Sequence, residues 1–186
     1  MRIVVAISGA SGAIYGIKLL EALRNAGVET DLILSHWAKE TIRIETDYPV
    51  EEVIGMADHY HDINDLGAAV SSGSYRHQGM VVAPCSMKTL AGIAGGMENN
   101  LIIRAAGVTL KEQRKLILLP RETPLTPIHL ENMLKLARIG VVMMPPVPAL
   151  YSKQKSIEGM INHTVGRVLD QLGIDNDLIA RWGEAK

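Results

Sequence analysis

Residues 2–12 read RIVVAISGASG, and this stretch decides the fold because it joins a strand to a glycine-rich turn. The unbroken apolar run Ile3–Ile7 is typical of a strand that is covered on both faces, as in a parallel sheet. A helix is expected to follow from residue 12 to residue 26, with Gly16, Ile17, Leu20 and Leu23 on one face. Strand, turn and helix in this order predict the first unit of an alternating βα protein.

The same alternation continues along the chain. Further apolar runs predict strands at Thr30–Leu34, Met80–Ala83, Lys115–Leu119 and Val141–Met144. Helices are expected near His36–Glu45, Thr89–Ala94, Leu101–Lys111 and Ile128–Ile139, and a last one carries Ile157, Ile161, Val165, Val168 and Leu172. The fold class predicted is α/β: a three-layer, doubly wound parallel sheet of the Rossmann or flavodoxin-like kind, with a C-terminal helix, in one domain over residues 1–186. Residues 50–75 give the weakest pattern.

Composition narrows the class of protein. Hydrophobic residues make up 47% of the 186 residues, which is high for a soluble protein and suggests apolar surface buried between subunits. The net charge is −1 with no long run of one sign, so no nucleic-acid partner is expected. No stretch is long and apolar enough to span a membrane, no signal peptide precedes the first strand, and the one cysteine, Cys85, suits a reducing compartment. We expect a cytoplasmic protein without a membrane partner.

Ligands of an open parallel sheet bind beyond the carboxyl ends of its strands. The five predicted strands are followed by short segments rich in glycine, proline and hydroxyl residues: Ser8–Gly12, Ser35-His36, Pro84–Ser86, Pro120–Pro124 and Pro145–Pro148. These segments meet at one edge of the sheet. They predict a crevice for a phosphate-bearing cofactor.

The glycine turn favours a mononucleotide. Gly9 and Gly12 allow a sharp turn, and the helix that begins there offers free N–H groups to an anion; the alternative is a tight turn capped by a serine. An NAD site would need an acid at the end of the second strand, where Ser35 stands, because Asp31 lies at the other end. A nucleophile elbow would need glycine where Ala13 stands. FMN fits the turn better than either.

Several charged residues are candidates for contacts with a ligand. Arg121 could fork onto a phosphate or a flavin carbonyl, and Glu122 could act as a general acid or base; the alternative is an ion pair in a surface loop. Arg104 and Lys111 are expected on one helix face, about 10 Å apart along the axis, as an anion clamp or as part of a solvated face. Arg167 precedes Asp170 by three residues, which predicts a salt bridge on a helix surface.

Other polar residues carry weaker signals. Tyr151 could point its hydroxyl at a ligand or cap a loop. His59 and His61 have strand-like spacing with no cysteine nearby, so we expect a solvated loop there and no metal site in the protein.

Taken in order, these segments resemble the flavin prenyltransferase family. The resemblance runs from Met1 to about Trp182, and each motif is weak alone but specific in this series. The motifs are Ser8–Ala13, Glu45–Asp47, Pro84–Ser86 with Thr89, Asn99–Leu101 with Arg104–Ala106, Leu110–Glu112, Pro120–Pro124, His129–Met133, Pro145–Ala149 with Tyr151, and Arg181-Trp182. The chain looks most like members that are paired with hydroxyaryl-acid decarboxylases. It departs from many members at Lys88, where glycine is common, and at Gln113, where a basic residue is common.

The resemblance implies a metal-independent enzyme that joins dimethylallyl phosphate to N5 and C6 of reduced FMN. The product is prenylated FMN, the cofactor of UbiD-type decarboxylases. Family members are homo-oligomers, namely dodecamers, with the site between subunits. The resemblance assigns catalysis to Ser11, Glu45 and Glu122, and prenyl phosphate binding to Arg104, Lys111, Tyr151 and Arg167. It assigns FMN binding to Gly9, Ala10, Ser11, Gly12, Ser35, Ser86, Met87, Lys88, Thr89 and Arg121.

Two alternatives share this fold or ligand. Flavin-dependent cysteine decarboxylases usually carry Ala-Ser-Ala-Asn after a proline, whereas Pro84 is followed here by Cys85-Ser86-Met87-Lys88. A non-catalytic FMN carrier for the decarboxylase would need no second phosphate site, which argues against that function.

Overall fold

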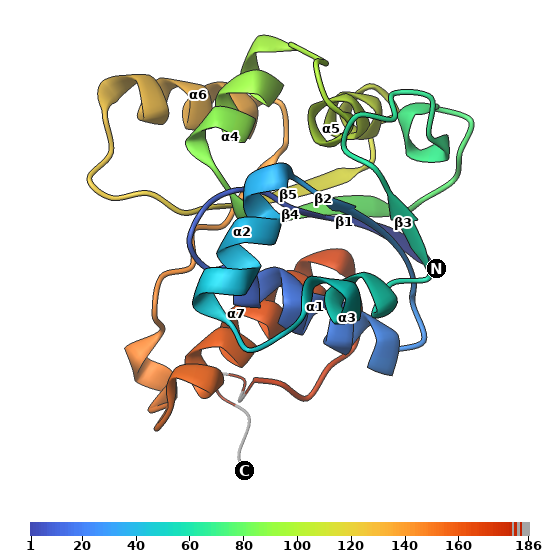
Figure 1. The fold of residues 1–186 in the computed structure, drawn as a ribbon. Helices are drawn as coiled ribbons and strands as arrows, with labels where there is room; N and C mark the ends of the chain where they lie inside the picture. Colours follow the sequence, from blue (N-terminus) through green and yellow to red (C-terminus); the bar gives the residue numbers. More distant parts are fainter. Residues whose placement is uncertain (180, 182, 184–186) are drawn as a thin grey trace.

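A computed structural model describes residues 1–179, 181 and 183, so Trp182 of the last motif lies outside the described residues. The centre of the fold is a six-stranded parallel sheet with the order β3-β2-β1-β4-β5-β6 (Figure 1). The strands are β1 (Arg2–Ile7), β2 (Glu29–Leu34), β3 (His59–His61), β4 (Gly79–Cys85), β5 (Lys115–Pro120) and β6 (Val142–Met143). The chain begins in the middle, winds to one edge and returns to build the other half. The predicted doubly wound α/β sheet is therefore confirmed.

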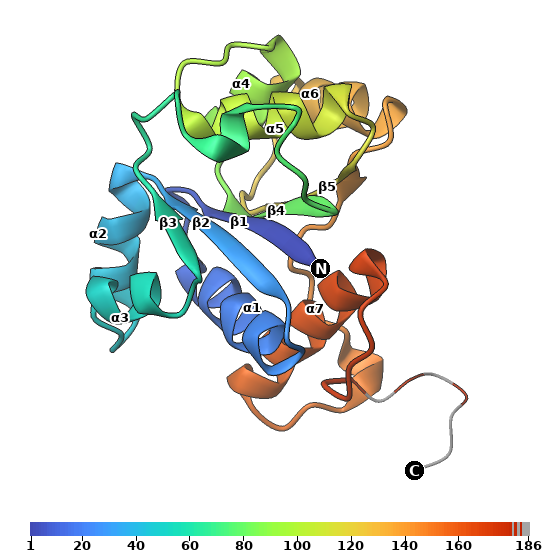
Figure 2. The same ribbon diagram turned by 90° about the vertical axis from the view of Figure 1, so that its right-hand side faces the viewer.

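Helices cover both faces of the sheet (Figure 2). One face carries α1 (Ala13–Asn25), α2 (His36–Glu45), α3 (Val50–Gly55) and α7 (Ile157–Leu172). The other carries α4 (Met87–Gly95), α5 (Leu101–Lys111) and α6 (Pro127–Arg138), and two short 3₁₀ turns, η1 (Ala69–Ser71) and η2 (Leu150–Ser152), complete the chain. Among the described residues, no helix combines the length and hydropathy needed to cross a bilayer.

The alternation of side chains along β1 explains why both faces need cover. Ile3, Val5 and Ile7 pack into the core on the α1 side, whereas Val4 and Ala6 pack into the core on the α5 side. All five side chains are fully buried. A strand that is apolar on both faces is stable only between two helical layers. Because all the strands are parallel, their carboxyl ends lie at one edge of the sheet.

Residues 50–75 contain structure that the sequence pattern did not predict. The segment His59–His61 was expected to be a solvated loop, but it forms the edge strand β3, which pairs with β2 in parallel. This segment has no apolar run to mark it; its backbone pairs with β2, Tyr60 packs against the core, and both histidines contact acidic residues of β2. His59 reaches Glu29 at 2.9 Å, and His61 reaches Asp31 at 2.7 Å.

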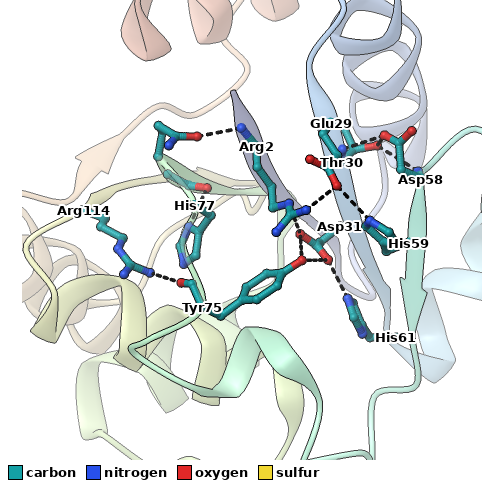
Figure 3. A network of polar contacts seen from close by, with 12 residues as sticks. Arg2, Glu29, Thr30, Asp31, Asp58, His59, His61, Tyr75, His77 and Arg114 are labelled. Carbon is teal, nitrogen blue, oxygen red and sulfur yellow. Dashed lines mark hydrogen bonds and ion pairs between the residues drawn. The ribbon is translucent and has the colours of Figure 1, made fainter.

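Asp31 is the centre of a buried polar network at the amino-terminal end of the sheet (Figure 3). Its carboxylate is fully buried, accepts hydrogen bonds from the Tyr75 hydroxyl at 3.1 Å, and lies 3.8 Å from Arg2 Nε. Burial, and then the charge of Asp31, raise the pKa of Tyr75 to about 12, so this hydroxyl remains a neutral donor at neutral pH. The network joins β1, β2 and β3 to the segment that precedes β4.

Candidate functional site

A cavity of about 290 Å³ lies at the carboxyl edge of the sheet, between the starts of α2, α4 and α5. Of the residues predicted to bind the cofactor, it brings together Gly9, Ser35, Ser86, Lys88 and Thr89. The remaining lining was not assigned a role from the sequence: His36, Trp37, Ile63, Asn64, Asn100, Ile102 and Ile103. The cavity is therefore half polar, from turns and caps, and half apolar, from isoleucine and tryptophan side chains.

The three helices that begin at this cavity are capped by residues that line it. The Ser35 hydroxyl accepts a hydrogen bond from Ala38 N at 3.0 Å, Ser86 accepts one from Thr89 N at 3.2 Å, and Asn100 accepts one from Ile103 N at 3.1 Å. Each cap satisfies one of the free N–H groups of its helix and leaves the positive end of the helix dipole at the cavity. Three such ends favour a ligand that carries phosphate or carbonyl oxygens.

Hydrogen bonds tie the loops of the carboxyl edge to one another. Ser35 N donates to Ile7 O at 3.0 Å, Ser8 N donates to Pro84 O at 3.2 Å, and Arg121 N donates to Cys85 O at 3.2 Å. These bonds connect the segments that follow β2, β1, β4 and β5 in a continuous row. The lining of the cavity is thus held by the sheet itself.

The turn after β1 depends on its glycines. A Cβ atom at Gly9 would lie 2.3 Å from Trp37 Cβ, and Gly12 has a φ of 100°, which favours glycine. The N–H groups at the start of α1, predicted to be free for an anion, are occupied in this structure: Gly12 N and Ala13 N both donate to Glu45 Oε2, at 2.7 and 3.4 Å. The prediction of a free helix start was wrong because Glu45, at the end of α2, caps α1. Ala10 and Ser11 lie in this turn between Gly9 and Gly12, and both are half-buried.

Within one chain, the four residues assigned to prenyl phosphate binding do not lie together. Arg104 and Lys111 belong to α5 on one face of the sheet, whereas Arg167 belongs to α7 on the other. Tyr151 lies in η2, with its hydroxyl 3.5 Å from Nε2 of His163 in α7.

Each of the three cations of this set has a carboxylate partner. Arg104 pairs with Glu98, Lys111 with Glu112 at 2.8 Å, and Arg167 with Asp170 at 2.8 Å. The salt bridge predicted for Arg167 is confirmed. Burial raises the pKa of Asp170, but hydrogen bonds from Arg181 and Asn176 and the charges of both arginines outweigh it, so this pKa lies below its ordinary value.

Lys88 and Arg121 differ from those three cations. Both side chains are exposed, and neither forms an ion pair or a side-chain hydrogen bond with any residue that the structure describes. The predicted surface pair between Arg121 and Glu122 is not formed; the Glu122 carboxylate accepts a hydrogen bond from Thr123 N at 3.0 Å. Lys88 lines the cavity and Arg121 follows the strand next to it, so both remain available to an anion. Met87, by contrast, packs against the core on the α5 side.

A doubly wound parallel sheet, with a cavity among capped helix starts at its carboxyl edge, defines a nucleotide- or flavin-binding α/β protein. The sequence matches the Flavoprotein family over residues 1–169. It is 55% identical to the flavin prenyltransferase UbiX of Thauera aromatica over an alignment of 182 residues. The alignment covers 98% of this chain and 94% of that protein. The chain belongs to the flavin prenyltransferases of the Flavoprotein family.

Solved structures agree with this family. The crystal structure of AnUbiX (PadA1) in complex with FMN and dimethylallyl pyrophosphate has a TM-score of 0.97 and 54% identity, covering 100% of this chain and 98% of that one. A dodecameric FMN-dependent UbiX-like decarboxylase from Escherichia coli O157:H7 has a TM-score of 0.97 and 51% identity, and the match covers 99% of this chain and 100% of that one. The peptidyl-cysteine decarboxylase EpiD, at 16% identity and a TM-score of 0.65, shares the fold alone.

Proposed function

We propose that this chain joins dimethylallyl phosphate to N5 and C6 of reduced FMN, and supplies prenylated FMN to a UbiD-type decarboxylase. The observation that carries the proposal is full-length likeness, at 54% identity, to a protein solved with FMN and dimethylallyl pyrophosphate. Residues 1–186 act as one FMN-binding domain. We place the reaction in the cytoplasm, because reduced FMN and the single free cysteine, Cys85, suit a reducing compartment.

The lining of the cavity fits a flavin. Ile63, Ile102 and Ile103 offer apolar walls for a ring system, and the capped helix starts offer donors for its oxygens. The cavity volume of about 290 Å³ is at the lower limit for ligand pockets, which is roughly 300 Å³. The cavity of one chain therefore encloses part of a mononucleotide. We assign FMN binding to Gly9, Ser35, Ser86, Lys88 and Thr89, with Ala10, Ser11, Gly12 and Met87 beside them and Arg121 at the margin.

The reaction displaces phosphate from an allylic carbon, and the reduced flavin supplies the electron-rich ring that takes up the prenyl group. The protein must therefore hold the leaving phosphate, exclude water and move a proton. We assign the first task to Arg104, Lys111, Tyr151 and Arg167, because cations stabilise the charge that develops on the leaving group. The apolar walls of the cavity exclude water. Glu122 is our first candidate for the proton carrier, with Ser11 and Glu45 as the other two.

Exposed apolar side chains support a homo-oligomer. Ile128 on α6 and Ile139 directly after it are 68% and 61% exposed. Val147 and Leu150, before α7, and Ile157, its first residue, are 72 to 78% exposed. Apolar patches of this kind mark protein interfaces. We infer a dodecamer, as for the relative from E. coli O157:H7, in which α5 of one subunit meets η2 and α7 of another and completes the phosphate site.

Complementation between two inactive variants tests this shared site. Oligomers of Arg104→Ala chains alone, or of Arg167→Ala chains alone, should have little activity. Oligomers co-assembled from equal amounts of both should regain about a quarter of the wild-type rate. If each site takes the two arginines from different chains, each arginine is present in half of the sites, and both are present in a quarter of them. Prenyl transfer by the purified mixed oligomer is the measurement. An inactive mixture of folded chains would mean that one subunit supplies both arginines. Oligomers mixed from Arg104→Ala and Lys111→Ala chains are the matched control; both residues lie on α5, so no repair is expected.

The flavin product tests the proposed function directly. Anaerobic incubation of the protein with reduced FMN and dimethylallyl phosphate should yield a flavin heavier by one prenyl unit, as measured by mass spectrometry. The yield should be the same with EDTA, because within the described residues no cluster of His, Cys, Asp or Glu is placed to hold a metal ion. A parallel reaction with the pyrophosphate identifies the donor. Bound but unmodified FMN would favour the carrier function, and CO₂ released from a cysteine peptide would favour the cysteine decarboxylase.

A further inference from the structure

The Ser8 hydroxyl lies between two segments that line the cavity. Ser8 directly precedes Gly9, is only 1% exposed, and does not itself line the cavity. Its Oγ donates to Pro84 O at 2.9 Å and accepts from Ser86 N at 2.8 Å. One side chain thus joins the turn after β1 to the start of α4.

The backbones of the two segments make one bond here, from Ser8 N to Pro84 O, but they do not reach Ser86. The register of β1 against β4 ends at the pair Ala6 and Val82, and Pro84 has no N–H group with which to continue the ladder. Ser8 uses both its N–H and its hydroxyl to donate to Pro84 O, and its hydroxyl oxygen then accepts the next available N–H, that of Ser86. The hydroxyl therefore extends the pairing of β1 and β4 up to the cavity wall.

Ser86 passes this constraint on to the ligand side. Its own hydroxyl caps α4 by accepting from Thr89 N, and donates to Thr89 Oγ1 at 3.1 Å. Gly9, Ser86 and Thr89 all line the cavity. Their relative positions therefore depend on the Ser8 hydroxyl as well as on the backbone bond from Ser8 N to Pro84 O, and none of the assigned roles uses that hydroxyl.

We propose that Ser8 is a positioning residue for the flavin: it fixes Gly9 relative to Ser86 and Thr89 without touching the ligand. The inference rests on the proposed function, because it takes FMN to be the occupant of the cavity. Loss of the hydroxyl leaves the half-buried N–H of Ser86 without its protein partner, which favours a rearrangement of this segment. The rearrangement would move two of the groups that bind the flavin.

The variant Ser8→Ala tests this inference through FMN binding, which needs no turnover. Titration of FMN, followed by flavin fluorescence and by the visible circular dichroism of the bound flavin, should give a Kd about tenfold higher than for the wild type. The matched control is Thr109→Val. Thr109 is also fully buried; its hydroxyl donates to Ala105 O at 2.8 Å and lies 3.8 Å from Met80 Sδ, but it lies in the half of α5 away from the cavity.

Thr109→Val should lower the melting temperature about as much as Ser8→Ala and leave FMN affinity unchanged. Wild-type affinity in Ser8→Ala would overturn the inference, as would an equal loss of affinity in Thr109→Val, which would make the effect one of general stability. Wild-type protein that fails to bind FMN would contradict the proposed function first, and the inference with it. If Ser8→Ala does not fold, Ser8→Cys keeps the side-chain volume with a much weaker hydrogen-bonding group, and the same comparison applies.

Discussion

Glutamine in place of Glu122 is expected to slow prenyl transfer at least about a hundredfold and to leave FMN affinity nearly unchanged, because general acid–base groups contribute roughly 10²–10⁴ in rate. The loop that carries Glu122 is fixed at the cavity margin by the bond from Arg121 N to Cys85 O at 3.2 Å. Adjacent side chains in such a loop point apart. If Arg121 holds the flavin, Glu122 is left facing the prenyl phosphate. Glutamine keeps the shape and most hydrogen bonds of the carboxylate but cannot transfer the proton.

Single-turnover kinetics at saturating donor measure this effect apart from product release. Two control variants separate the chemical step from binding. Arg121→Ala should weaken FMN binding, because its guanidinium has no other partner among the described residues. Glu131→Gln, at an exposed position on α6, should change neither quantity. Near-normal turnover in Glu122→Gln would assign Glu122 to structure and leave Ser11 or Glu45 as the proton carrier.

Alanine in place of Asp31 is expected to lower the free energy of unfolding by about 3 kcal/mol, which is the lower end for breaking a buried ion pair. The substitution removes a fully buried carboxylate and leaves the Tyr75 hydroxyl and His61 without their acceptor. We take the lower end of the range because Arg2 is partly exposed and retains Glu29 as a second partner. The loss should loosen β3 first, since Asp31 joins this edge strand to β2.

Urea denaturation at a fixed protein concentration measures the effect, because the midpoint for an oligomer depends on concentration. Asp175→Ala is the matched control: this residue is exposed, and its carboxylate forms no ion pair or hydrogen bond with the described residues. An Asp31→Ala midpoint equal to that of Asp175→Ala would show that the network contributes nothing net to stability. Hydrogen exchange in residues 59–61 then tells whether the edge strand opens before the rest of the sheet.

Most of the fold follows from local sequence pattern. Apolar runs mark every strand of the sheet except β3. Thr126-Pro127 marks the start of α6, where a capping box with His129 is found. The edge strand β3 could not be predicted this way. Two of its three residues are histidines, and its contacts are with Glu29 and Asp31 of β2, about thirty positions earlier in the chain, which no local pattern reveals.

The site was predictable to the extent that it follows strand ends. Gly9, Ser35 and Ser86 each come directly or nearly directly after a strand, and a parallel sheet brings such positions together without further information. Contacts that depend on three-dimensional packing were missed. Glu45 is 33 positions from Gly12, and no spacing rule connects a carboxylate at the end of one helix to the start of another. Asn64 and Ile63 line the cavity from a loop whose sequence carries no signal for it.

The ion pair of Arg2 with Glu29 lies at the amino-terminal end of β1 and β2, whereas the cavity lies at their carboxyl end, and six strand residues span roughly 20 Å. This separation is useful for protein engineering. Changes that strengthen the pairing of Arg2 with Glu29 act far from the groups at the cavity, whereas β3 ends only two positions before Ile63, which lines it. A more heat-resistant catalyst can therefore be sought by varying that end alone, without the loss of activity that often accompanies stabilising changes near a reaction centre.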